Sequence, residues 1–180
     1  MNFVNNENAQ FVLIKLISGK TYYHTNRLHF KGSKEKYSSL YHIGALVQNK
    51  NIDKTIVNFV VDTGSTLTIL SVKDAIKLKL LSVKEESSFG LINNHNLDIE
   101  KTQTSIGSMD LLKLEDVIIT FYFNNRCCFA EYFEAIYVAK PLIKSEEEYR
   151  LVMDIPSVLG MDVLKNYKIE FSDDSVLLER

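Results

Sequence analysis

The segment 59–66 joins an apolar run to residues that can do chemistry. It reads Phe-Val-Val-Asp-Thr-Gly-Ser-Thr, so Asp62 directly follows a β-prone stretch and Gly64 comes two residues later. A buried charge costs several kcal/mol unless it is paired or neutralised, so a carboxylate at the end of a buried strand points to a reaction or a ligand. Gly64 permits a tight loop and the close approach of another backbone. The segment therefore predicts a reactive or ligand-binding site at Asp62.

The two hydroxyl residues that flank the glycine, Thr63 and Ser65, are predicted to support this site. A hydroxyl can donate a hydrogen bond to a carboxylate while it accepts one from a backbone amide. If Ser65 donates to Asp62, the ionised form of the carboxyl group is favoured. We therefore predict Asp62 as the catalytic residue, with Thr63, Gly64 and Ser65 as the supporting loop.

Two segments of the chain resemble motifs of one known family. The sequence from Val60 to Ser65 resembles the active-site loop of aspartic proteases, because a hydrophobic pair precedes Asp-Thr-Gly-Ser. The segment 157–164, which reads Ser-Val-Leu-Gly-Met-Asp-Val-Leu, resembles the hydrophobic-hydrophobic-glycine motif and short helix of the single-lobed, retropepsin-like members. Gly160 lies 98 residues after Asp62, a spacing compatible with that family if a few loops are long.

The resemblance implies a fold and an activity. The fold is mainly β, a closed, orthogonal β-barrel of the acid-protease type with two or three short helices. The activity is that of an aspartic endopeptidase acting on extended polypeptides, with no metal or other cofactor. The resemblance covers residues 41–180, which we predict as the protease domain, whereas residues 1–40 match no known pattern and are predicted as an N-terminal extension that forms a β-hairpin.

A single catalytic aspartate per chain predicts a homodimer. Peptide hydrolysis by carboxylates needs one group that activates water and another that protonates the carbonyl or the leaving nitrogen. Of the ten aspartates in the chain, only Asp62 begins an Asp-Thr/Ser-Gly sequence. A second chain must then supply the second carboxylate, and the two groups would share one proton as a coupled pair. Dimerisation through a C-terminal hairpin, 167–178, is expected because an unpaired apolar edge is a liability for a monomer.

The resemblance also implies a glycine-containing β-hairpin, the flap, that covers the substrate. We place it at 86–104, with Gly90 near its tip and the polar residues Asn93, Asn94, His95 and Asn96 across it. The predicted substrate-binding residues of the flap are Gly90, Asn93, Asn94 and His95. Substrate would lie extended and add to the flap like a further strand. An exposed loop histidine is more often solvated than bound to a ligand, so contact between His95 and substrate is the less common alternative.

Alternating hydrophobic residues predict hairpins along most of the chain. The expected pairs are 41–48 with 55–61, 117–123 with 133–139, 167–171 with 176–178, and 10–17 with 21–30 before the main domain. Helices are expected at 72–80, 144–152 and 161–166, the first two capped by Ser71 and Ser145. Asp162 is expected to cap the third helix rather than to serve as a second catalytic acid.

The composition of the chain limits which classes of binding partner and which cellular compartment we expect. Lys plus Arg number 21 and Asp plus Glu 23, which gives a net charge of −2 and no field that would attract nucleic acid or anionic lipid. The adjacent Cys127 and Cys128 exclude a disulfide scaffold and a zinc knuckle. No signal peptide is apparent, and no apolar run approaches the ~20 residues of a membrane span. We expect a cytoplasmic protein with no nucleic-acid, membrane or metal partner.

Two other classes of function stay open. A retropepsin-like module could bind extended peptides or dimerise without cutting them; the intact sequence from Asp62 to Ser65 favours the enzyme, because an inactive module has no need of a costly carboxylate. A nucleotide-binding loop of the actin and sugar-kinase type also places Asp-x-Gly-Ser/Thr after a strand. Those folds need two such lobes and usually about twice this length.

Overall fold

The computed structural model describes residues 11–15, 21–25, 29–34, 40–50, 52–83, 90–104, 107–123 and 127–179. One large sheet runs through these residues, with the strand order β13-β14-β3-β4-β5-β12-β6-β11-β10-β9. Its strands are β3 (His29–Lys34), β4 (Tyr41–Asn49), β5 (Ile52–Val61), β6 (Ile69–Leu70), β9 (Asp98–Thr104), β10 (Gly107–Phe123), β11 (Cys127–Lys140), β12 (Ser157–Leu159), β13 (Lys168–Phe171) and β14 (Ser175–Glu179).

Two small sheets and three short helices complete the described structure. β1 (Phe11–Lys15) pairs with β2 (Thr21–Thr25), and β7 (Leu81–Val83) pairs with β8 (Leu91–Asn93). The helices are α1 (Val72–Lys77), α2 (Glu146–Asp154) and α3 (Met161–Leu164). The side chains of Ser71 and Ser145 cap α1 and α2, as the sequence predicts.

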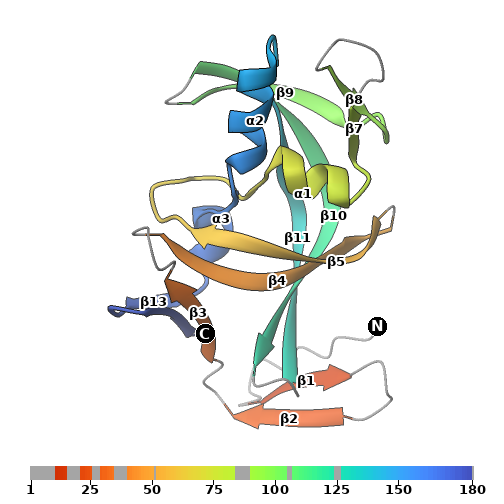
Figure 1. The fold of residues 1–180 in the computed structure, drawn as a ribbon. Coiled ribbons are helices and arrows are strands. Elements are labelled where there is room, and N and C mark those ends of the chain that lie inside the picture. Colours follow the sequence, from red (N-terminus) through yellow and green to blue (C-terminus); the bar gives the residue numbers. More distant parts are fainter. Residues whose placement is uncertain are drawn as a thin grey trace.

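The large sheet closes on itself because β4 pairs on both of its edges. One edge of β4 pairs with β5, and Ala45 to Gln48 pair with Ile118 to Phe121 of β10. Six strands, in the order β4-β5-β12-β6-β11-β10, therefore form a closed barrel. In Figure 1, β4 and β5 cross the long strands β10 and β11 at a large angle. The predicted fold class, mainly β with a closed barrel and two or three short helices, is confirmed.

The alternation of buried and more exposed residues along the strands explains which side chains fill the barrel. In β4, Ile43, Ala45 and Val47 are buried while the residues between them are more exposed, as expected for a strand with one face toward the core. The pattern changes at the end of β5, where Phe59, Val60 and Val61 are all buried. Both edges of β5 are paired there, with β4 and with β12, so the strand that leads into Asp62 is rigidly held.

Part of the segment 1–40 belongs to the large sheet. β3 pairs with β14 on one side and, through Ser33 and Lys34, with the start of β4 on the other. Gly32 makes this approach possible, since a Cβ atom there would lie 2.2 Å from the backbone oxygen of His42. β1 and β2 pair as a hairpin at the N-terminus, but the predicted second strand, 21–30, is not one strand, because β2 ends at Thr25 and residues 29–30 belong to β3. The division of the chain at residue 40 stays a prediction.

The described residues contain neither a membrane-spanning helix nor a cluster of metal-ligating side chains. None of the helices in this part of the chain has the length and apolar character needed to cross a membrane. In the same ranges, no three His, Cys, Asp or Glu side chains gather as they would around a metal ion.

Candidate active site

Asp62 is the first residue after β5, and its backbone is fixed by the neighbouring strand. Its N–H donates a hydrogen bond to the carbonyl of Leu159, the last residue of β12, at 3.1 Å. β12 continues the parallel pairing of β5, with Val61 opposite Leu159. The side chain of Asp62 is only half-buried, although the three residues before it are buried. The strand therefore presents a carboxylate at the edge of a closed core.

The loop after Asp62 turns tightly around the carboxylate. The backbone N–H of Gly64 donates to Asp62 Oδ1 at 2.8 Å, and the N–H of Ser65 donates to the carbonyl of Asp62 at 3.3 Å. A Cβ atom on Gly64 would lie 3.2 Å from Asp62 Oδ1, closer than an ordinary contact. Thr63 and Gly64 are exposed. One carboxylate oxygen thus holds the loop closed while the loop itself stays accessible from outside.

Ser65 supports the loop in another way than the sequence suggests. Its hydroxyl donates to the carbonyl of Leu67 at 2.8 Å, so the prediction that Ser65 donates to the Asp62 carboxylate is wrong. A hydroxyl next to a turn often bonds to nearby backbone, and here that local acceptor is preferred. Ser65 therefore shapes the turn that follows the glycine rather than contacting the carboxylate.

The two segments that resemble the protease motifs lie against each other. The N–H of Met161 donates to the carbonyl of Ser65 at 2.8 Å, and the N–H of Asp162 donates to that of Thr66 at 3.2 Å. Gly160 permits this contact, because a Cβ atom there would lie 2.3 Å from the backbone oxygen of Leu67. The start of α3 is therefore packed directly on the loop that carries Asp62.

The carboxylate of Asp162, on α3, binds the end of the same loop. Asp162 accepts hydrogen bonds from the Thr68 hydroxyl at 2.6 Å and from the Thr68 N–H at 2.9 Å. The Thr68 hydroxyl in turn accepts from the N–H of Gly160 at 3.0 Å. Gly160, not Asp162, is the N-cap residue of α3, so the predicted capping role is wrong. Asp162 instead uses its carboxylate to join two segments 94 residues apart.

Removing the hydroxyl of Thr68 should weaken this junction. Thr68 is fully buried, and Thr68→Val keeps its shape while it removes the hydroxyl bond to Asp162 and leaves the Gly160 N–H without its acceptor. We expect a loss of about 1–3 kcal/mol in the free energy of unfolding, measured by urea denaturation. Thr66→Val is the matched control, because Thr66 is exposed. Equal stability of the two variants would contradict the assigned role of Thr68.

The residues predicted for the flap lie in and beside the turn after β8. Asn93 exchanges hydrogen bonds with the backbone of Leu97, and Asn94 donates to the carbonyl of Lys79 at 2.9 Å. His95 is exposed, and Gly90 directly precedes β8, while residues 86–89 lie outside the described part of the chain. In that part, no hydrogen bond joins these four residues to the Asp62 loop. Their contact with substrate stays a prediction.

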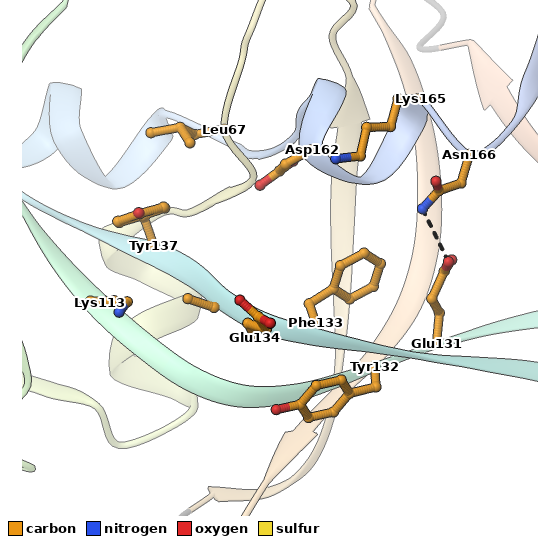
Figure 2. Close-up of a pocket in the computed structure, with 11 residues that line it drawn as sticks. Leu67, Lys113, Glu131, Tyr132, Phe133, Glu134, Tyr137, Asp162, Lys165 and Asn166 are labelled. Atoms are coloured by element: carbon orange, nitrogen blue, oxygen red, sulfur yellow. Dashed lines mark hydrogen bonds between the residues drawn. The ribbon is translucent and has the colours of Figure 1, made fainter. Parts of the chain in front are cut away.

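A cavity of about 460 Å³ lies between the junction of Leu67 with Asp162 and the strand β11. Figure 2 shows Leu67 and Asp162 on one wall and Phe133 and Tyr137 of β11 on the other. Burial, followed by the charge of the nearby Glu100, raises the pKa of the Tyr137 hydroxyl, so this group is neutral near pH 7. Asp62 does not line the cavity. The cavity is therefore a neighbour of the Asp62 loop and not the cleft in front of its carboxylate.

Comparisons with known proteins find a likeness in structure alone. No protein-family model matches the sequence, and no curated protein matches it. One solved structure that matches is the crystal structure of a retropepsin-like aspartic protease from Rickettsia conorii. The TM-score is 0.49 at 19% sequence identity, over 85% of this chain and 91% of that chain. These values do not assign the chain to a family.

Proposed function

We propose that this protein is a retropepsin-like aspartic endopeptidase that works as a homodimer. The observation that carries the proposal is the placement of Asp62. A strand paired on both edges holds its backbone, a glycine turn closes on its carboxylate, and α3 packs on that turn. Such a fixed and accessible carboxylate suits general acid–base chemistry, because the reacting group must be held in place before substrate arrives.

In the proposed reaction, the Asp62 carboxyl groups of two chains face each other across a two-fold axis. They cannot both ionise cheaply at that separation, so they share one proton. The ionised group takes a proton from water as the water attacks the peptide carbonyl, and the protonated group donates a hydrogen bond to the carbonyl oxygen. Thr63 of each chain would bond across the interface, and the carbonyl of Gly64 would contact the main chain of the substrate.

The two ends of the large sheet support a proposal for where the partner and the substrate bind. β13 is the last strand at one end, and its Phe171 side chain is 49% exposed, which supports the C-terminal hairpin as the dimer contact. β9 is the last strand at the other end. In Figure 1 the hairpin of β9 and β10 extends beyond the barrel on the side where the chain leaves β5. We therefore propose β9, which overlaps the predicted flap, as the edge to which an extended substrate adds.

A peptidase assay with the purified full chain tests this proposal. We expect cleavage of extended, apolar peptides that a pepstatin-type inhibitor blocks, in a sample whose mass in solution is that of a dimer. A dimer that binds such peptides without cleaving them would contradict the enzyme and favour the peptide-binding module. A rise in melting temperature on adding nucleotide, without peptidase activity, would favour the phosphate-binding loop instead.

A further inference from the structure

We infer that Asp74 is a positioning residue for Asp62 and that it acts through Ser157. Its predicted effect on reaction rate rests on the proposed function, whereas its effect on the Asp62 backbone does not. Asp74 stands in the first turn of α1, twelve residues after Asp62, and makes no hydrogen bond with Asp62 itself. The connection runs instead through the buried start of β12.

Three polar residues form a closed cluster where α1 meets β12. The Ser157 hydroxyl donates to Asp74 Oδ2 at 2.6 Å and accepts from the backbone N–H of Ser71 at 2.9 Å. The Ser71 hydroxyl accepts from the N–H of Asp74 at 3.2 Å and donates to the same Oδ2 at 3.3 Å. Ser157 is 0% exposed and Ser71 3%. A charged acceptor in such surroundings makes short, strong hydrogen bonds, so the cluster fixes Ser157 firmly.

The position of Ser157 determines where Asp62 lies. β12 has only three residues, of which Ser157 pairs with Phe59 and Leu159 pairs with Val61. The carbonyl of Leu159 is the acceptor for the N–H of Asp62. So short a strand cannot absorb a shift at one end without moving the other, because successive residues share one extended backbone. Release of Ser157 should therefore loosen the bond from Asp62 to Leu159.

The cluster does more than a helix cap requires. Capping of α1 needs the Ser71 side chain, and an acidic residue in the first turn is favourable there through the helix dipole alone. Neither effect calls for a bond between Asp74 and a strand 83 residues away. One aspartate holds each end of the segment from β12 to α3. Asp74 accepts a hydrogen bond from Ser157 at its start, and Asp162 accepts from Thr68 at its end. Asp74 is thus the anchor at the start of β12, opposite Phe59, and its hold on Asp62 passes along β12 to Leu159.

Hydrogen exchange of the Asp62 amide tests this inference in the full chain, with or without peptidase activity. We expect Asp74→Ala to speed exchange at Asp62 by about tenfold or more, relative to amides of the ladder between β10 and β11 in the same protein. Asp74→Asn, which keeps an acceptor oxygen, should restore much of the protection. The control is Lys73→Ala, because Lys73 is an exposed neighbour of Asp74 on α1. It should change exchange neither at Asp62 nor in the ladder between β10 and β11.

Kinetics give a second readout where the wild type cleaves peptide. Asp74→Ala should lower kcat by about tenfold at unchanged KM, because the Asp62 carboxylate is displaced while the surfaces that bind substrate persist. The kcat of Asp74→Asn should lie between those of Asp74→Ala and the wild type. Unchanged Asp62 exchange in Asp74→Ala, or an equal rise at Asp62 and in the ladder, would overturn the inference. Absence of wild-type cleavage would count against the proposed function alone, since the exchange result still decides the role of Asp74.

Discussion

Asp62→Asn should abolish peptide hydrolysis while the dimer persists. The amide has nearly the size of the carboxylate but cannot act as a base, and the half-buried position of Asp62 gives it room without repacking. We expect kcat/KM to fall by about a thousandfold or more, because both the basic and the acidic member of the proposed pair are lost in a dimer of variant chains. Steady-state kinetics and the mass in solution are the two measurements.

The control for this variant is the same chemical change at an exposed aspartate. Asp154→Asn, at the last residue of α2, lies outside the Asp62 loop and should keep wild-type kinetics. Substantial activity in Asp62→Asn would remove Asp62 from the mechanism. Loss of the dimer in that variant would instead assign Asp62 to assembly.

Gly160→Ala should have the largest effect on folding. A Cβ atom at Gly160 would lie 2.3, 2.4 and 2.9 Å from the backbone O, C and N of Leu67. Backbone atoms cannot rotate aside as a side chain does, so either α3 or the Asp62 loop must move. We expect a loss of about 3 kcal/mol or more in the free energy of unfolding, or failure to accumulate folded protein, measured by urea denaturation of the purified chain.

Gly44 provides the matched control within β4. A Cβ atom there would meet nothing within 4 Å, and alanine costs less backbone entropy than glycine in a strand. Gly44→Ala should therefore change the free energy of unfolding by less than about 0.5 kcal/mol in the destabilising direction. If Gly160→Ala were equally mild, the close packing of α3 on the Asp62 loop would be wrong.

The sequence predicts best those parts of the fold that neighbouring residues build. The hairpins β4–β5, β10–β11 and β13–β14 join strands through short connections, and each shows a run of alternating apolar residues. The caps Ser71 and Ser145 also act within one turn of their own helices. Such local patterns can be read from one chain because the periodicity and the partner are both close in sequence.

The parts that escape prediction depend on contacts between distant segments. β12 and β6 have three and two residues, too few for any period, and they exist because β5 and β11 lie beside them. β9 carries polar residues on both faces, as befits an edge strand, so its hydrophobic alternation is weak. Asp162 resembles a helix cap in sequence, but its acceptor oxygens are taken up by Thr68. No local rule reveals that pairing.

Mixing wild-type and Asp62→Asn chains tests most directly whether two chains build one active site. If each site needs one Asp62 from each chain, random reassociation with an equal amount of variant should lower the rate per wild-type chain to about one half, and a ninefold excess to about one tenth. Mixing with Asp154→Asn chains should leave the rate per Asp62-bearing chain unchanged. A rate per wild-type chain that does not respond to the Asp62→Asn chains, although mixed dimers have formed, would contradict the shared site.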